Sequence, residues 1–307
     1  MVAPDFMVHD VWASNFDTEF ANLRKAAQKA THVIPFIEFP GLCMTPLGTF
    51  FSKEQYTYQQ LLVNVNALKP IQFGFTFVYE SSNTAESNQL AVYQFNLHFD
   101  LNEDMFTNDA IQAYEEAGLN FQRHSTEGIK LLDFGELLTT SGLIASKITW
   151  ASFHSAFDFG FLTRSLYGGV LPSDVRLFCN IFNKYFSKVY DIKHMMNHPN
   201  LAHRGLKPEM SLQEVADVLK IQRSGPRHVA SWDSLLAAHV FLQLKSELNL
   251  SPDDEISKQL VGIIYGIGKN PILPQGAVIQ SIFTAKTSQS INNSFDDRRR
   301  PFSIPKA

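Results

Sequence analysis

The chain has 307 residues, of which 45% are hydrophobic and 18% are charged, and its formal net charge is −4. This length allows one large domain or two ordinary ones. The small negative charge excludes a nonspecific nucleic-acid binder with a global basic field, so a nucleic-acid substrate would need a local site. Cys43 and Cys179 lie far apart in the sequence, which argues against a disulfide framework or a cysteine zinc site.

Export and membrane signals are not expected. The stretch MVAPDFMVHDVWASNF lacks a basic region followed by an apolar run, so it does not resemble a signal peptide. We find no run of about 18 uncharged apolar residues that would predict a membrane span. Together with the two separated cysteines, these features predict a cytoplasmic protein, with the nucleus left open as a second location.

An amphipathic helix is the first predicted element. Its apolar face is made by Phe16, Phe20, Leu23 and Ala27. Asn15 is the expected N-cap, because its side chain can accept a hydrogen bond from the first turn. The next segment, HVIPFIEFPG at residues 32–41, predicts a buried strand that ends in Glu38 before a Pro-Gly turn.

A hairpin of two aromatic-rich strands is predicted over residues 71–80 and 90–100. Side chains that alternate onto one face are Phe73, Phe75, Phe77, Tyr93, Phe95 and Leu97. The segment PLGTFFSKEQYTYQQ before this hairpin carries four aromatic residues that could form core or a binding face: Phe50, Phe51, Tyr56 and Tyr58. Helices are expected after it at 108–118 and 131–142.

The second half is predicted to be mainly helical. Residues 147–169 read as strand, turn and helix, and residues 172–186 as a helix capped by Ser173. The expected core side of that second helix consists of Leu177, Phe178, Ile181, Phe182 and Tyr185. A capping box formed by Ser211 and Glu214 starts another helix, and a long helix begins near residue 232.

The order of these elements predicts a mixed α/β fold with helices around a central sheet. No Pro/Gly/Ser-rich linker divides the chain, so we expect a single domain over residues 1–287. Residues 288–307 are polar and contain a short basic run, which predicts a disordered tail.

Three acidic residues stand at predicted element boundaries. Glu38 closes the first strand, Asp158 begins a helix, and Asp233 begins the long helix five residues after His228. Carboxylates that converge in this way suit a hard cation such as Mg²⁺, and a nearby histidine can activate a metal-bound water. Taken singly, each acid is more often a helix cap or a surface residue than a ligand, so the metal-site prediction depends on the set.

Three other histidines have simpler explanations. His154 precedes Asp158, and a packed or hydrogen-bonded ring is favoured there over a ligand. His198 and His203 lie in a polar segment that lacks a matching set of ligands, so a solvated loop is favoured.

Long segments of the sequence resemble the Caf/Pop-type poly(A) deadenylases, the nuclease subunit of the Ccr–Not complex. From about Val8 to Asn270 the similar segments are EFPG, PLGTFFSKEQYTYQQLLVNVNALKPIQFGFTF, GELLTTSG, WASFHSAFDFGFL, YDIKHMM, LQEVADVLKIQRSGPRHVASWDSLLAAHVF and IYGIG. The resemblance implies a ribonuclease-H-like fold and 3′–5′ hydrolysis of poly(A) RNA with Mg²⁺ or Mn²⁺. It also implies two protein partners, a large Not-type scaffold subunit and a Ccr-type deadenylase.

The same resemblance implies a site of four acids and one histidine. Glu38, Asp158 and Asp233 match metal ligands, and His228 matches the general base. The first acid of the family's D-x-E motif falls at Phe36, which has no lone pair to offer a metal. Pro35 is a second departure, because proline is rare in a central strand.

Three interpretations stay open at this point. The chain could be a pseudo-nuclease that keeps the fold for protein contacts, and this is the function we expect. It could instead be a weak nuclease with one metal held by Glu38, Asp158 and Asp233. Finally, another carboxylate, Asp5 or Asp10, could fill the gap left by Phe36.

Overall fold

A central sheet organises the computed structural model, which describes residues 7–80, 88–144, 147–251 and 254–269. Its six strands lie in the order β1-β4-β3-β2-β5-β6. Their bounds are β1 (Val8–Val11), β2 (His32–Glu38), β3 (Gln72–Tyr79), β4 (Gln89–Asn96), β5 (Thr149–Ser152) and β6 (Val189–Asp191). The β2–β3 and β3–β4 pairs are antiparallel, and the β1–β4, β2–β5 and β5–β6 pairs are parallel.

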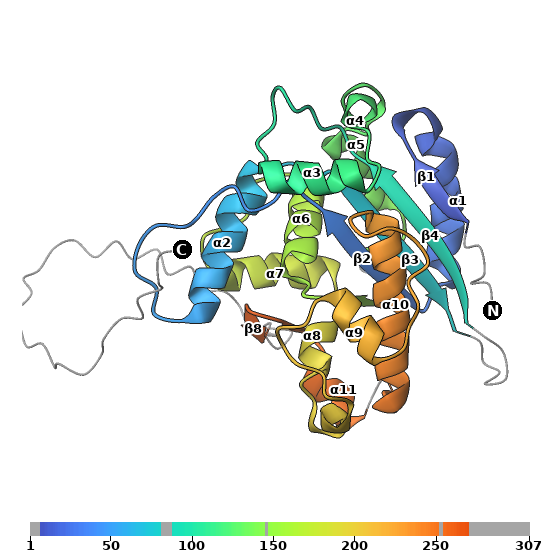
Figure 1. Ribbon diagram of the computed structural model, residues 1–307, viewed down its shortest axis with the longest axis vertical. Helices are drawn as coiled ribbons and strands as arrows, with labels where there is room; N and C mark the ends of the chain where they lie inside the picture. Colours follow the sequence, from blue (N-terminus) through green and yellow to red (C-terminus); the bar gives the residue numbers. More distant parts are fainter. Residues whose placement is uncertain (1–6, 81–87, 145–146, 252–253, 270–307) are drawn as a thin grey trace, which may run out of the picture.

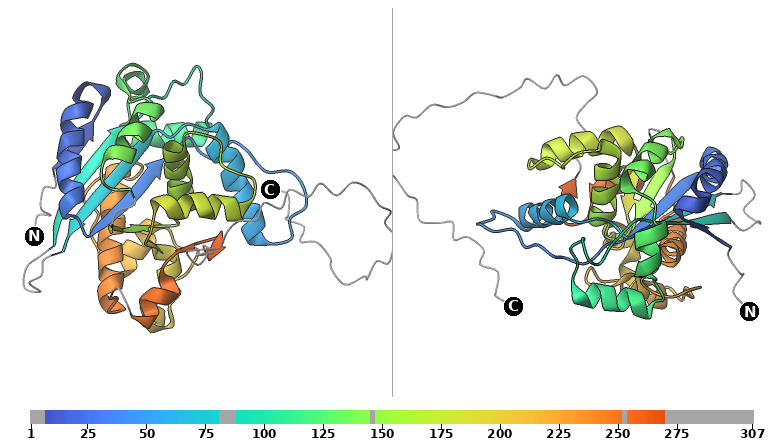
Figure 2. Two further views of the ribbon diagram at one scale, coloured as in Figure 1. Left: turned by 180° about the vertical axis from the view of Figure 1, so that it is seen from behind. Right: turned by 90° about the horizontal axis from the view of Figure 1, so that it is seen from above.

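Helices cover both faces of this sheet (Figure 1). Their bounds are α1 (Phe16–Lys29), α2 (Lys53–Ala67), α3 (Asn108–Glu116), α4 (Phe121–Glu127), α5 (Leu131–Thr140), α6 (Ala156–Tyr167), α7 (Val175–Tyr185), α8 (Ile192–Met195), α9 (Leu212–Val218), α10 (Ala230–Glu247) and α11 (Glu255–Leu260). One apolar core joins the sheet to α1, α2, α5, α6 and α7, and a second joins it to α8, α9, α10 and α11. Figure 2 shows the sheet between α6 and α7 on one side and α10 on the other.

These layers confirm the predicted mixed α/β class and most of the expected elements. The predicted aromatic face of the hairpin is also confirmed, since Phe73, Phe75 and Phe77 are each 0% exposed. The Phe134 ring from α5 stacks on Phe73 with 4.8 Å between the ring centroids. Within the described part of the chain, we find no helix that is both long and apolar enough to span a membrane. The predicted tail at 288–307 lies outside the described residues.

The N-cap position predicted at Asn15 is confirmed, and the one predicted at Ser173 is wrong by one residue. Asn15 stands at the N-cap of α1, but its side chain makes no capping hydrogen bond and instead accepts one from the Trp12 N–H. Helix α7 is capped by Asp174, one residue later than the predicted Ser173, because the Asp174 carboxylate accepts from the Arg176 N–H.

One apolar prediction was wrong, and the aromatic segment left open between core and binding face can be placed. Leu177, expected on the core side of α7, is 48% exposed. The aromatic segment before the hairpin contains helix α2, which was not predicted, and it divides between core and surface: Tyr58 is 2% exposed and Phe51 is 95% exposed.

Strand β2 accommodates Pro35 without interrupting its pairing with β3. The register continues from His32 opposite Val78 to Glu38 opposite Gln72. The Ile37 N–H points away from β3, because it donates to Asp158. Backbone groups alternate sides along a strand, so the Pro35 nitrogen also faces away from β3. On that side the ladder to β5 ends at Val33, and no strand hydrogen bond is lost there.

Helix α10 approaches β3 closely because β3 has a glycine at the crossing point. A Cβ atom added at Gly74 would lie 2.1 Å from the Ala230 carbonyl oxygen and 2.6 Å from the Ser231 nitrogen. Both are backbone atoms of the first turn of α10, so they cannot rotate away. Gly74 therefore fixes where the N-terminus of α10 sits on the sheet.

Replacing Gly74 with alanine should displace α10 and destabilise the fold. We expect Gly74→Ala to lower the free energy of unfolding by about 3 kcal/mol, measured by urea denaturation. Gly169→Ala is the matched control, because its Cβ would meet only the Tyr167 ring at 3.4 Å. Equal stability of the two variants would contradict the role assigned to Gly74.

Candidate active site

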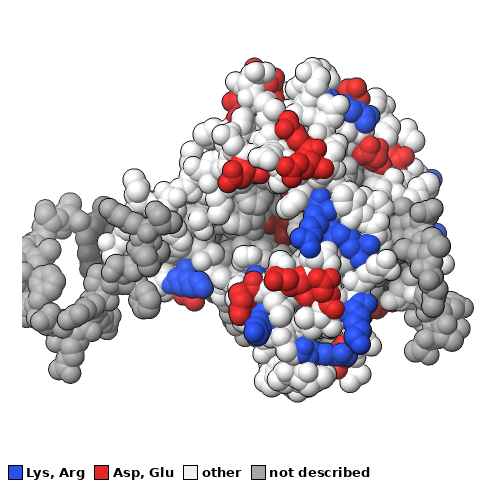
Figure 3. Space-filling view, in the orientation of Figure 1, with Lys and Arg blue, Asp and Glu red and all other residues white. Residues whose placement is uncertain are grey.

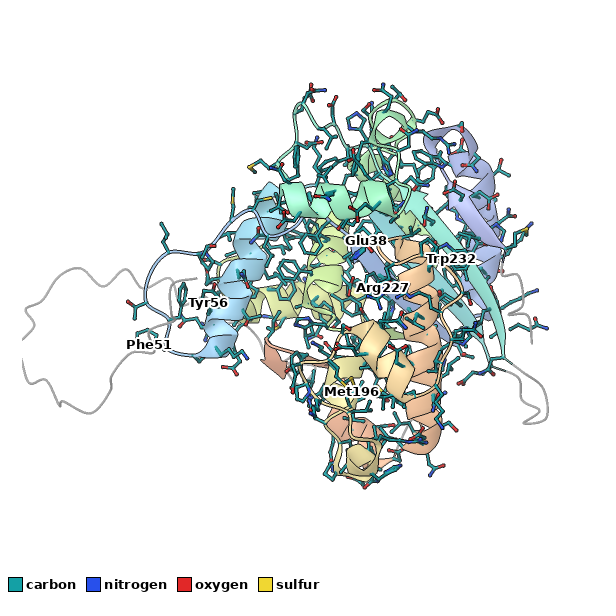
Figure 4. The ribbon with its side chains drawn as sticks, in the orientation of Figure 1. Glu38, Phe51, Tyr56, Met196, Arg227 and Trp232 are labelled. Atoms are coloured by element: carbon teal, nitrogen blue, oxygen red, sulfur yellow. The ribbon has the colours of Figure 1, made fainter. Side chains whose placement is uncertain are left out.

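The three predicted acids converge where β2, α6 and α10 meet. Glu38 ends β2, Asp158 lies in the first turn of α6, and Asp233 lies in the first turn of α10. They are 6%, 5% and 6% exposed, respectively. Figure 4 shows Glu38 between α3 and the start of α10, with Phe51 and Tyr56 well away at α2.

Asp158 occupies the gap that opens between β2 and β5. Its Oδ1 accepts a hydrogen bond from the Ile37 N–H at 2.9 Å, and its Oδ2 accepts one from the Ser152 hydroxyl at 2.5 Å. Burial raises the pKa of Asp158 to about 7, although both hydrogen bonds favour the charged form and oppose the rise. Asp158 thus replaces a strand partner for β2 as well as contributing a carboxylate to the site.

Glu38 and Asp233 form a close pair of buried carboxyl groups. Burial raises the pKa of Glu38 well above its ordinary value, and the negative charge of Asp233 raises it further. The nearby Tyr114 hydroxyl, which donates its hydrogen bond to the Phe39 carbonyl oxygen at 2.6 Å, opposes this rise in the pKa. Glu38 Oε1 has no hydrogen-bond partner among the described residues. Burial beside a second carboxylate therefore favours the protonated form of Glu38.

Arg223 forms an ion pair with Asp233 that was not predicted from the sequence. Its Nη2 donates to Asp233 Oδ1 at 2.6 Å, and its Nε donates to Gln213 Oε1 at 2.7 Å. The Arg223 side chain is 14% exposed, so solvent screens this ion pair only in part. The sequence did offer a signal for this residue, because Arg223 lies five residues before His228 in a segment that resembles the deadenylases.

His228 lies at the edge of this acid cluster. Its backbone N–H donates to Asp233 Oδ2 at 3.0 Å, and its φ of 62° is in the left-handed region, which is uncommon for a residue other than glycine. The side chain is exposed, and its ring centroid lies 6.2 Å from that of Tyr114. This places the histidine at the site, and its role as general base remains a prediction.

Phe36 lies on the same face of β2 as Glu38, because side chains two residues apart share a face. The ring is partly buried and packs against the core that α10 forms on this face. Its position opposite Gly74 puts it beside the first turn of α10. An aromatic ring therefore lies next to the acids at the position where the resemblance expects another acid.

Asp10, one of the two alternative carboxylates named above, does not lie at the site. Asp10 is held in β1, where it accepts hydrogen bonds from Asn96 Nδ2 at 2.7 Å and Trp12 Nε1 at 2.8 Å. Asp5 lies outside the described residues. A substitute for the missing acid is therefore not provided by Asp10.

Asp191 is a fourth buried carboxylate near the site, and it acts as a structural hub. It is 0% exposed and accepts hydrogen bonds from the backbone N–H groups of His154, Ser155, Lys193 and Tyr265. The Ser155 hydroxyl donates to it as well, at 2.7 Å. His154 is exposed, and its ring centroid lies 5.5 Å from that of Tyr265, so the packed or hydrogen-bonded ring predicted there is not confirmed. Asp191 therefore fixes the turn between β5 and α6 that presents Asp158.

The donors present do not fit a two-metal arrangement. Both Asp158 oxygens already accept hydrogen bonds and Asp233 is paired with Arg223, whereas Glu38 Oε1 lacks a partner among the described residues. As these side chains lie, the described residues contain no group of three or more His, Cys, Asp or Glu that could hold a metal ion. The assignment of Glu38, Asp158 and Asp233 as metal ligands stays a prediction.

The surface around the acids is mixed in charge (Figure 3). Acidic side chains gather over α3, where Asp109, Glu115 and Glu116 are exposed, and Lys and Arg side chains lie beside a hollow below them. Arg227, labelled in Figure 4, lies in this region close to the start of α10. Such a surface could admit a negatively charged chain only along its basic side.

Comparison with known proteins identifies the family. The family model described as CAF1 family ribonuclease matches residues 11–137 and 138–241. This chain belongs to the CAF1 ribonuclease family. A Caenorhabditis elegans relative, CCR4-NOT transcription complex subunit 7, is 40% identical over 269 residues, which cover 87% of this chain and 86% of the relative.

Solved structures support the same assignment to the CAF1 ribonuclease family. Schizosaccharomyces pombe Pop2p in a Mg²⁺- and Mn²⁺-bound form is 34% identical with a TM-score of 0.75, over 84% of this chain and 99% of that one. Yeast CAF1 co-crystallised with the NOT1 MIF4G domain is 29% identical with a TM-score of 0.65, over 86% and 99%. The fold is therefore ribonuclease-H-like, as the resemblance implied.

The raised pKa of Glu38 predicts a pH-dependent stability. The folded state keeps the Glu38 proton above pH 4.5, where the unfolded chain loses it, so stability falls as pH rises through this window. We expect Glu38→Gln to stabilise the fold relative to the parent by about 1 kcal/mol or more at pH 8, and by less at pH 5. Urea denaturation at the two pH values measures this.

The control for this experiment is Glu116→Gln on the exposed side of α3. It should keep the pH dependence of the parent, because it removes an exposed carboxylate and leaves buried Glu38 in place. A stability difference between Glu38→Gln and the parent that stays constant from pH 5 to pH 8 would show that Glu38 is not held protonated.

Proposed function

We propose that this protein is a deadenylase-family subunit of a Ccr–Not-type mRNA decay complex, whose own catalysis is lost or strongly reduced. It takes part in poly(A) tail shortening as a structural or regulatory subunit. The observation that carries the proposal is Phe36, which lies on the acidic face of β2 where the family resemblance calls for the first metal ligand.

The physical argument concerns charge and space. Two-metal nucleases hold their ions about 3.5–4 Å apart with oxygens that bridge them. Phe36 removes one such oxygen and one negative charge, and its ring lies beside the remaining acids. Losing a ligand of this kind should cost several kcal/mol of transition-state stabilisation, on the order of 10³-fold in rate.

A second candidate function is a nuclease with one rearranged metal ion. It is favoured by the Oε1 atom of Glu38, a buried oxygen without a partner among the described residues. A Mg²⁺ or Mn²⁺ ion held by Glu38, Asp158 and Asp233 would satisfy that oxygen and relieve the repulsion between the carboxylates. Asp158 and Asp233 would first have to leave their present hydrogen-bond partners.

The proposed partners follow from the relatives. A family member has been co-crystallised with the MIF4G domain of NOT1, which supports a large Not-type scaffold as the partner of this chain. A Ccr-type deadenylase and poly(A) RNA are proposed on the resemblance alone. The location proposed for this assembly is the cytoplasm.

Restoring the acid should restore part of the site. The purified protein should remove adenylates from oligo(A) at no more than about 10⁻³ of the rate of a relative with all four acids, in Mg²⁺ or Mn²⁺. Phe36→Asp should increase both Mn²⁺ affinity, measured by calorimetry, and the release of nucleotides. Pro35 is replaced as well in a second variant.

Phe51→Asp is the matched control, because it makes the same change at a side chain that is 95% exposed and remote from the acids. It should change neither quantity. Full turnover by the unmodified protein would refute the pseudo-nuclease. If Phe36→Asp gains no metal affinity, an acid at position 36 does not rebuild a metal site with Glu38, Asp158 and Asp233.

Binding to the scaffold is a separate expectation. A purified Not-type MIF4G domain should retain this protein in a pull-down, and Phe36→Asp should be retained equally, because scaffold binding does not depend on the catalytic acids. A correctly folded protein that fails to bind the scaffold would remove the main support for a structural role in the complex.

A further inference from the structure

The loop between α9 and α10 covers the first turn of α10 and contains His228. Its backbone bends sharply near both ends, because Lys220 and His228 have φ values of 60° and 62°, in the left-handed region. In the middle of the loop, Gly225 lies against the indole of Trp232, which Figure 4 shows beside the start of α10. A Cβ atom added at Gly225 would lie 2.2 Å from Trp232 Cδ2, so the loop and the helix are in direct contact.

One arginine of this loop is bonded to three parts of the chain. Arg223 is paired with Asp233 of α10 and donates to Gln213 of α9. Its Nη1 also donates to the Pro226 carbonyl oxygen within the loop, at 3.1 Å. The Gln213 amide is oriented for its contact, since its Nε2 donates to Asp217 Oδ1 at 2.8 Å and its Oε1 is left to accept. A guanidinium holds its donors in fixed directions, so it can join all three parts at once.

Side chains hold this loop in place. Residues 222–228 form no backbone–backbone hydrogen bond with the described residues. The loop backbone instead bonds to side chains: the His228 N–H donates to Asp233 Oδ2 at 3.0 Å, and the Pro226 carbonyl accepts from Arg223. Asp233 Oδ1 accepts from Arg223, so the loop occupies both oxygens of this carboxylate. The position of His228 therefore depends on an aspartate whose negative charge Arg223 compensates.

We propose that Arg223 is a positioning residue that clamps the loop of residues 220–229 onto α10 in the protein without a metal ion. At Asp233 its guanidinium supplies the positive charge that a divalent cation could supply instead. His228 and Asp233 thus keep their places in a metal-free site. The clamp also explains why the donors do not fit a two-metal arrangement, because both oxygens of Asp233 are engaged. It operates with or without residual catalysis, so it does not rest on the proposed function.

Limited trypsin digestion of the full chain measures how often the loop opens, because cleavage requires local unfolding. The bond after Arg227 is followed by mass spectrometry, since Arg227 is exposed and is present in every protein compared. With a chelator, Arg223→Gln should be cleaved there at least about tenfold faster than the parent, because hydrogen bonds of a charged group are lost. Excess Mn²⁺ should slow this cleavage in Arg223→Gln, where Asp233 can accept a cation, and should leave the parent unchanged.

Arg204→Gln is the matched control. Arg204 also forms an ion pair with α10, through two hydrogen bonds of 2.7 Å to Glu247, but at the opposite end of the helix from the loop. This variant should be cleaved after Arg227 at the rate of the parent. Equal cleavage of Arg223→Gln and the parent would overturn the clamp, and so would equal acceleration by Arg204→Gln, which would indicate general destabilisation. Protection of the parent by Mn²⁺ as strong as that of Arg223→Gln would show that Arg223 does not stand in for a cation.

Discussion

The close approach of two buried carboxyl groups, Glu38 and Asp233, is the constraint around which this end of the molecule is built. Negative charge is expensive to bury unless a cation or a proton compensates it. Here Arg223 lies 2.6 Å from Asp233, and the raised pKa of Glu38 indicates a retained proton. A nuclease of this family would be expected to use metal ions for the same compensation. The described arrangement achieves it with groups that the chain itself supplies.

The contact between α10 and β3 brings the carboxyl groups of Glu38 and Asp233 together. Asp233 reaches Glu38 only because the first turn of α10 lies directly on β3 at Gly74, with backbone against backbone. The same contact places Ser234 between two strands, where its hydroxyl lies 2.7 Å from the Thr76 hydroxyl and donates to the Ile34 carbonyl at 2.8 Å. The electrostatics of the acids therefore depend on packing within the second core.

Sequence patterns predicted the elements that have a strong periodicity and the acids that end them. The aromatic alternation at Phe73 and Phe75 and the capping box at Ser211 were of this kind. Helix α2 was missed because polar and aromatic residues mix around it, so that Tyr58 is buried while Phe51, just before the helix, is exposed. Arg223 was missed because its ion pair with Asp233 requires the loop before α10 to fold back against the first turn of that helix. No regular spacing in the sequence predicts such a loop conformation.

The presence of Glu38, Asp158 and Asp233 is weaker evidence for catalysis than the sequence alone suggests. Asp158 satisfies the Ile37 N–H at the point where β5 leaves β2, and Asp233 satisfies the N–H of His228, a residue with a left-handed backbone. Removing either carboxylate would leave a backbone donor without its partner, which costs about 1–3 kcal/mol when buried. Asp158 and Asp233 therefore have a structural role whether or not the site hydrolyses anything. Glu38 differs, because its Oε1 serves no described group, and it is the acid whose presence structure alone does not explain.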